Sequence, residues 1–224
     1  MKLSEQTLTL LSNFAKIQPN MMFREGNKIT TMADAKNILA SATLDVEIDQ
    51  EFGIYDLSQF LATLTLVNEP QISLKKSYLE VSDVNKLSKV RYYYSSPESL
   101  VFPSKEIKMP EGDVTFTLTK ENLAKLQKAS ATLGIGEVCI SPDGNALKLE
   151  VTNPENRTSN AFAVEAEGEF DEDADFRFVF LMNNFKMIPG DYEVEISKKL
   201  ISKFTSKDID LTYWIAVEKE STYK

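Results

Sequence analysis

Residues 114–134, VTFTLTKENLAKLQKASATLG, place a strand, a helix start and a helix stop in immediate succession. In the first five residues larger apolar side chains alternate with threonines, a pattern that predicts a half-buried strand. Thr119 is a typical N-cap residue, and Gly134 is a typical residue for a helix end. Between them, Leu123 and Leu126 begin an apolar face at helical spacing. The stretch therefore predicts a strand that leads directly into a helix, as in an α+β unit.

Further strands follow this helix. Asp143-Gly144 is a hairpin signal that joins two of them. A second, short helix is predicted at about 181–188, where Pro189-Gly190 ends it. The predicted strands are Glu137–Ser141, Ala146–Thr152, Ala161–Glu169, Phe176–Phe180, Tyr192–Ser197 and Leu211–Glu218.

The amino-terminal half repeats this order of elements. Leu8 and Leu11 lie 115 positions before Leu123 and Leu126 and belong to a helix that Ser4 caps. The residue identity between the halves is low, so the repeat is one of order and pattern. The other predicted elements of this half are strand Leu44–Ile48, a helix from Asp56 to about Leu66, and strands Ser77–Ser82 and Lys89–Tyr94.

Residues 95–113 interrupt both patterns. Pro97, Pro103, Pro110 and Gly112 fall in this stretch, a composition that is typical of a connector between domains. We therefore expect an N-terminal domain at 1–98, a connector at 99–113 and a C-terminal domain at 114–224.

The composition excludes several classes of function. The chain has 224 residues, a net charge of −9, no histidine and one cysteine, Cys139. Without histidine there is no Ser-His or Cys-His nucleophile pair, and a zinc site is disfavoured. No catalytic residue, metal ligand or cofactor is predicted, and the protein is not expected to be an enzyme. The single cysteine, the lack of a signal peptide and the lack of a membrane span predict a cytoplasmic protein.

Positive charge is concentrated in the predicted helices. The windows 4–16, 55–66, 120–132 and 181–188 sum to +2, which leaves −11 for the rest of the chain. Lys125 and Lys128 lie away from the apolar face of their helix and are expected in solvent. An ordinary solvated helix face is the alternative reading of these charges.

Segments along nearly the whole chain resemble the sliding clamps of T-even-type bacteriophages. The resemblance is strongest at Ile54-Tyr55-Asp56-Leu57, followed by Phe60-Leu61 and Leu66-Val67-Asn68. The opening Met1-Lys2-Leu3-Ser4 and the later Lys186-Met187, Pro189-Gly190 and Tyr192 are also similar to that family. No catalytic motif takes part, so the order and spacing of the segments carry the resemblance.

The resemblance implies a DNA clamp fold with two similar domains per chain. Each domain would pack two helices on antiparallel β-sheet, and three chains would form a trimeric ring around duplex DNA. The implied partners are the phage DNA polymerase, the clamp loader ATPase, and late-transcription sigma and coactivator proteins, with the host cytoplasm as location. The residues expected to face DNA are Lys120, Lys125, Lys128 and Lys186, with Lys16 on the first helix and Lys2 just before it.

A partner-peptide pocket is predicted beside the connector. Clamps of this class bind short peptides in an apolar pocket on the outer face. The apolar residues that the chain offers there are Val101, Phe102, Pro103, Ile107, Ile215 and Val217. Such residues either pack the connector against the core or are offered to a partner.

Two other functions compete with the clamp. The first is a monomeric nucleic-acid-binding or transcription accessory domain, which the acidic charge and the absence of a basic groove disfavour. The second is a carboxylate-dependent hydrolase, for which the sequence contains no recognisable acid–base pair.

Overall fold

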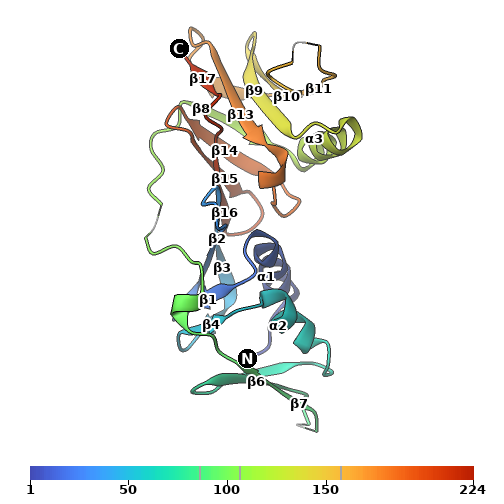
Figure 1. Ribbon diagram of the computed structural model, residues 1–224, viewed down its shortest axis with the longest axis vertical. Helices are drawn as coiled ribbons and strands as arrows, with labels where there is room; N and C mark the ends of the chain where they lie inside the picture. Colours follow the sequence, from blue (N-terminus) through green and yellow to red (C-terminus); the bar gives the residue numbers. More distant parts are fainter. Residues whose placement is uncertain (86, 106, 157) are drawn as a thin grey trace. The chain divides into compact units, whose positions relative to one another are not determined.

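The computed structural model describes residues 1–85, 87–105, 107–156 and 158–224. It divides into two compact units, Met1–Glu106 (unit 1) and Ile107–Lys224 (unit 2) (Figure 1). Lys86, Glu106 and Arg157 lie outside the described residues, and Glu106 falls within the predicted connector. Each unit is described by itself.

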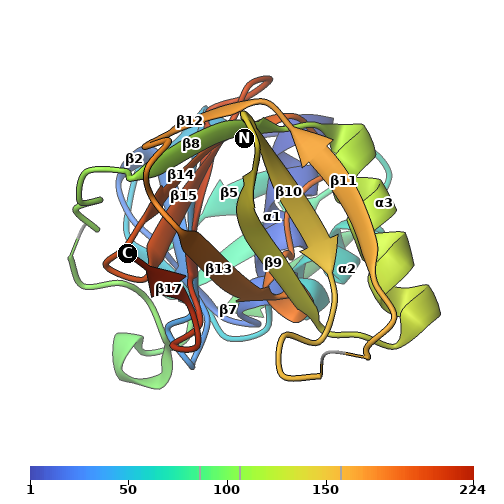
Figure 2. The ribbon, with the colours of Figure 1, turned by 90° about the horizontal axis from the view of Figure 1, so that it is seen from above.

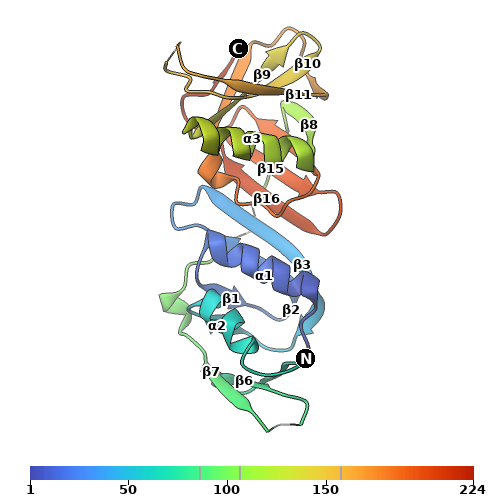
Figure 3. The same ribbon diagram turned by 90° about the vertical axis from the view of Figure 1, so that its right-hand side faces the viewer.

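Unit 1 carries two helices and three groups of antiparallel strands. Its elements are α1 (Glu5–Ile17), β1 (Met21–Phe23), β2 (Gly26–Met32), β3 (Ile38–Ile48), β4 (Phe52–Ile54), α2 (Leu57–Leu64), β5 (Gln71–Leu74), β6 (Tyr78–Ser82), β7 (Lys89–Tyr93) and the 3-10 turn η1 (Pro97–Ser99). β1 pairs with β4, β2 pairs with β3, and β5, β6 and β7 form a sheet in that order. α1 packs against α2 and β3, and the two helices lie side by side (Figure 3).

Unit 2 has one α-helix and two antiparallel sheets. Its elements are β8 (Val114–Leu118), α3 (Lys120–Leu133), β9 (Glu137–Asp143), β10 (Ala146–Val151), β11 (Phe162–Ala166), β12 (Gly168–Phe170), β13 (Phe176–Leu181), the 3-10 turn η2 (Met182–Asn184), β14 (Tyr192–Ser197), β15 (Ile201–Ser206), β16 (Leu211–Ala216) and β17 (Thr222–Tyr223). One sheet has the order β11-β10-β9-β13-β17, and the strands β12-β8-β14-β15-β16 pair in that order in the other. α3 packs on β10 and β11 (Figure 2).

Each unit has its own apolar core, because its helices and most of its strands bury apolar side chains. Phe14 and Leu57 are fully buried in unit 1, and Phe180, Phe204 and Tyr213 are fully buried in unit 2. The Tyr213 hydroxyl accepts a hydrogen bond from the Ile188 N–H at 3.1 Å.

The helix predicted at 181–188 is wrong. The structure has a single 3-10 turn, Met182–Asn184, followed by non-helical backbone at Phe185 with φ −81° and ψ 52°. The segment is too short to gain much from helical hydrogen bonds, and its buried residues Asn184, Phe185 and Met187 do not follow one helix face. Among the described residues, unit 2 therefore has one α-helix and not two.

Candidate nucleic-acid interface

α1 is anchored at its start and buries one face. The Ser4 hydroxyl accepts from the Thr7 N–H at 3.0 Å, as predicted for its N-cap. The Thr7 hydroxyl donates to Asp45 Oδ1 at 2.6 Å, which joins the helix to β3. Hydrogen bonds from the Ser4 and Thr7 hydroxyls lower the pKa of Asp45. A negative charge therefore stays beside the first turn of α1.

The outer face of α1 is polar and nearly neutral. Its exposed side chains are Glu5, Gln6, Thr9, Ser12 and Lys16. Glu5 and Lys16 are the charged members of this set, and their charges cancel. Lys2, which precedes the helix, is also exposed.

α2 is a two-turn helix without any charged residue. The Asp56 carboxylate accepts from the Gln59 N–H at 2.8 Å and caps the helix, as the sequence predicted. The Tyr92 hydroxyl donates to the Asp56 carbonyl at 2.9 Å, and the Tyr92 ring packs edge-on against Phe60. The exposed side chains of the helix are Ser58, Gln59 and Ala62. α2 therefore presents an uncharged surface.

α3 is capped at both ends. Thr119 Oγ1 accepts from the Asn122 N–H at 3.1 Å, and Asp191 Oδ1 accepts from the Lys120 N–H at 2.7 Å. Gly134 ends the helix in the left-handed region, with φ 67°, as predicted. Leu123 and Leu126 are buried, so the remaining faces of α3 are exposed to solvent.

The exposed surface of α3 is basic. Lys120, Lys125 and Lys128 are all exposed, against one acidic residue of the helix, Glu121. Lys125 Nζ lies 2.6 Å from a Glu121 carboxylate oxygen, one helical turn away. The hydrogen bond and charge of Lys125 lower the pKa of Glu121. The carboxylate is therefore ionised and neutralised by its neighbour, and two lysines remain in excess.

Lys186 joins this surface although it is not on a helix. The Gln127 side chain of α3 donates to the Phe185 carbonyl at 3.3 Å. Phe185 is buried against the Phe180 and Phe204 rings, which holds the segment in place. The exposed Lys186 side chain therefore starts next to α3. Of the four predicted lysines of unit 2, Lys120, Lys125 and Lys128 lie on α3 and Lys186 follows Phe185, which bonds to that helix; Lys2 and Lys16 belong to unit 1.

The residues of the predicted peptide pocket have different environments. In unit 1, the Val101 N–H donates to Asn20 Oδ1 at 2.8 Å, and the Arg24 guanidinium lies 5.5 Å from the centre of the Phe102 ring. Pro103 and, in unit 2, Ile107 are half-buried. Ile215 and Val217 are interior residues of unit 2, with exposed fractions of 0% and 4%. The pocket combines residues of both units and stays a prediction.

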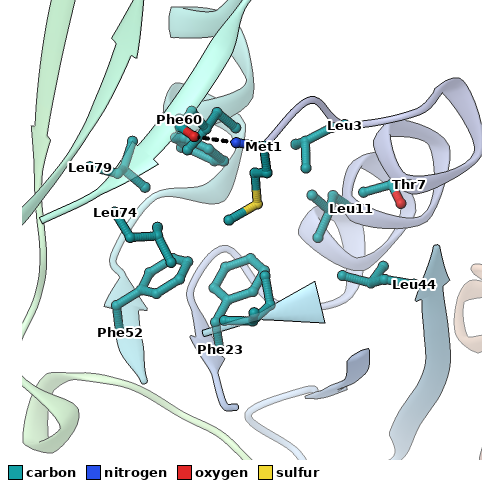
Figure 4. A pocket seen from close by; sticks show the side chains of 12 residues that line it. Met1, Leu3, Thr7, Leu11, Phe23, Leu44, Phe52, Phe60, Leu74 and Leu79 are labelled. Carbon is teal, nitrogen blue, oxygen red and sulfur yellow. Dashed lines mark hydrogen bonds between the residues drawn. The ribbon is translucent and has the colours of Figure 1, made fainter. Parts of the chain in front are cut away.

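A small apolar cavity lies in unit 1 (Figure 4). Its volume is about 20 Å³, and side chains such as Met1, Phe23 and Phe52 line it. The Met1 amino group donates to the Ile72 carbonyl at 2.6 Å, and the Ile72 N–H donates to the Met1 carbonyl at 2.8 Å. Met1 thus extends the sheet beside β5, which no sequence pattern indicated. The cavity has room for little more than one water molecule and is not a ligand site.

A larger, open hollow lies in unit 2. It has a volume of about 390 Å³ and is lined by residues 110–113 and 197–199. Lys198 Nζ lies 3.0 Å from Asp113 Oδ1. Partial burial disfavours ionisation of Asp113, but the Lys198 backbone N–H and ammonium group together lower the pKa of this carboxyl. Both members of this ion pair line the hollow.

The free cysteine and the possible metal ligands are further groups of chemical interest in the part of the chain that the structure describes. Burial raises the pKa of the Cys139 thiol to about 11, so it is protonated at neutral pH. No three His, Cys, Asp or Glu side chains among the described residues are grouped to hold a metal ion. No helix in the described ranges is long and apolar enough to cross a membrane.

Comparisons with known proteins show the family to which the chain is similar. Residues 2–102 match the family described as DNA polymerase processivity factor, and residues 115–219 match gp45 sliding clamp, C terminal. The sliding clamp of Vibrio phage KVP40 is 29% identical over 97% of this chain and 99% of its own length. The sliding clamps of Escherichia phage RB69 and Enterobacteria phage T4 are each 30% identical over 100% of this chain and 99% of theirs.

A solved structure shares the fold. The Proliferating Cellular Nuclear Antigen from Entamoeba histolytica superposes with a TM-score of 0.68 over 94% of both chains, at 15% sequence identity. The predicted α+β clamp fold is therefore confirmed, with three helices on antiparallel sheets in the described residues of this chain.

Proposed function

The chain belongs to the family of phage sliding clamps, which are DNA polymerase processivity factors, and from this premise we propose that three chains close into a ring around duplex DNA. Such a ring keeps the polymerase on its template and carries out no chemistry of its own. The two units per chain support three chains, because six units then complete the ring.

The polar helix faces are the observation that carries the proposal. Every helix of the described chain packs through one apolar face and leaves the other to solvent. In the ring these outer faces would line the hole. The six lysines at issue, Lys2, Lys16, Lys120, Lys125, Lys128 and Lys186, are all exposed and lie on or beside these helices. They would meet the phosphates of the duplex.

The overall charge suits a clamp that slides. A net charge of −9 per chain repels DNA from most of the surface, while the excess lysines of α3 attract it locally. Strong phosphate contacts would slow sliding, since each contact must be broken as the ring moves. Retention would then depend on enclosure of the DNA and only weakly on affinity.

The ends of two sheets support ring closure. β7 is the end strand of its sheet in unit 1, and β11 is the end strand of its sheet in unit 2. The Tyr94 N–H bonds back to Ser77, so the alternate residues Lys89, Arg91 and Tyr93 direct their backbone groups outward. Such an edge is a ready template for pairing with another strand.

The exposed side chains of the two edges are also complementary: one edge is basic, the other is acidic, and each has an exposed aromatic ring. β7 carries exposed Lys89 and Arg91, and Tyr93 is 63% exposed. β11 carries exposed Glu165, and Phe162 is 36% exposed. Pairing of β7 of one chain with β11 of the next is a head-to-tail contact, which closes into a ring when the rotation fits.

The further partners follow from the same proposal. The DNA polymerase and the clamp loader ATPase would bind the apolar peptide pocket at the connector, with late-transcription sigma and coactivator proteins as further occupants. The ring would act in the cytoplasm of the host cell. Because Ile215 and Val217 are interior residues, the accessible part of this pocket would be Val101, Phe102, Pro103 and Ile107.

Two measurements test the proposal. Light scattering over a range of micromolar concentrations should give about 76 kDa, three times the 25.3 kDa chain. Rings loaded on duplex DNA should stay on molecules whose ends are blocked and leave when one end is cut free. A monomer that binds open and blocked DNA equally would instead indicate an ordinary nucleic-acid-binding domain.

A further inference from the structure

The three helices differ at the centre of their outer faces. At 3.6 residues per turn, the side chain opposite the buried stripe is Ser12 in α1, Ala62 in α2 and Lys128 in α3. All three positions are exposed. The residue best placed to meet a ligand is therefore cationic only in unit 2.

The neighbouring charges increase this difference. On α3, Lys125 lies on the same stripe as Lys128, and Lys186 starts beside the helix through the bond between Gln127 and Phe185. Only Glu121 opposes them on this helix, and it is paired with Lys125. On α1, the charges of Glu5 and Lys16 cancel.

The helix N-termini of unit 1 do not compensate for the missing charge. Free N–H groups at a helix start attract anions. At α2 the Asp56 carboxylate already accepts from the first turn. At α1 the carboxylate of Asp45 bonds to Thr7 and Glu5 is in the first turn, so acidic side chains oppose a phosphate there. Neither helix offers an anion site.

We infer that unit 2 supplies most of the phosphate contacts in the ring, with Lys128 at their centre, and that unit 1 presents a neutral surface along which the duplex slides. The inference rests on the proposed function, since it assumes that these helices line the hole. In a ring of three chains, three basic surfaces would alternate with three neutral ones around the DNA.

The test moves one charge between the units. The variants are Lys128→Ser, Ser12→Lys and the double variant, which has the net charge of the wild type. Lys16→Ser is the matched change on α1. The probe is a linear duplex with one end blocked, onto which rings thread from the free end, and the measured quantity is occupancy against NaCl concentration. Trimer mass and thermal unfolding check that each variant folds.

Lys128→Ser should lower occupancy severalfold at low salt. It removes one phosphate contact per chain, so the slope of log K against log [NaCl] should fall by about 2.7 for three chains. Ser12→Lys should raise occupancy, and the double variant should recover most of the wild-type value. Lys16→Ser should change the slope by less than half as much as Lys128→Ser.

The outcomes separate this inference from the proposed function. If Lys16→Ser changes the slope by half as much as Lys128→Ser or more, both units hold the DNA and the inference is overturned. If the wild-type protein is not retained on a duplex blocked at both ends after threading, the ring itself is wrong. The ring and the inference are both supported if all variants are retained on the blocked duplex and Lys128→Ser gives the largest change in the slope of log K against log [NaCl].

Discussion

Unit 1 and unit 2 build similar layers but distribute charge differently. Unit 1 has 11 basic and 13 acidic residues, whereas unit 2 has 14 and 21. The more acidic unit nevertheless carries the basic helix, α3, while the nearly balanced unit carries two helices with neutral outer faces. Net charge therefore says little about where a protein meets DNA; the face on which the cations lie decides it.

In both units the helices are held by an apolar core. Truncating a buried core side chain should therefore produce the largest loss of stability. Phe14→Ala in α1 should cost about 3–5 kcal/mol of unfolding free energy, and Leu126→Ala in α3 about 2–5 kcal/mol, because both side chains are buried. Denaturant unfolding measures both. Losses below about 1 kcal/mol would mean that the helix is not anchored as described.

The charges on the two sheet edges provide the next largest effect. Arg91→Glu should weaken chain association by about tenfold or more, because the acidic β11 edge would then meet a like charge. Glu165→Lys should act similarly, and the double variant should recover the trimer. Sedimentation or light scattering over a concentration series gives the result. Failure of the double variant to recover would place the interface elsewhere.

The N-cap residues of α2 and α3 should differ in how much they stabilise their units. Asp56→Ala should destabilise unit 1 by about 1 kcal/mol, because it removes the carboxylate that accepts from Gln59. Thr119→Ala should lower the unfolding free energy by less, about 0.5 kcal/mol, because Asp191 still accepts from the Lys120 N–H. Thermal unfolding with exposed Ser58→Ala as a control measures the difference. Equal losses would show that Asp191 does not support the helix start.

The smallest effect concerns Glu121. Glu121→Gln should leave the melting temperature unchanged, because the pair with Lys125 is exposed. It should raise DNA occupancy, since the surface of α3 becomes more basic. The hydrogen bond and charge of Lys125 lower the pKa of Glu121, so the carboxylate stays ionised through the usual glutamate range and loses its charge only as the pH falls through the lowered value. The difference from wild type should therefore be the same at pH 7 and pH 5.

The elements with strong local signals were predictable from the sequence. Ser4, Asp56 and Thr119 cap their helices as predicted, and Gly134 has the left-handed backbone expected at a helix end. In each case one side chain or one backbone angle determines the structure, and both are properties of a short stretch of sequence.

The segment at 181–188 was not predictable in this way. Its composition permits a helix, but the Phe185 ring packs against Phe180 of the preceding strand β13 and Phe204 of β15. Tertiary packing therefore overrides the local preference. The bond between Gln127 and Phe185, which places Lys186 beside α3, could not be foreseen for the same reason.

The positions of the lysines were partly predictable. The periodicity of α3 placed Lys125 and Lys128 in solvent, and both are exposed. The sequence did not show that Glu121 neutralises one of them, although the spacing of four residues was a signal for such a pair. Burial of Ile215 and Val217 was also missed, because an alternating strand does not by itself show which face meets the core.

The two end strands β7 and β11 have a genetic consequence in the proposed ring. Each chain in the proposed ring would contribute one edge of each kind, so a chain with one damaged edge still joins a neighbour through the other. In a cell that makes equal amounts of intact and damaged chains, only about one eighth of rings would contain three intact copies under random assembly. A lesion at either edge should therefore be dominant over the wild-type allele, whereas loss of the whole chain should be recessive.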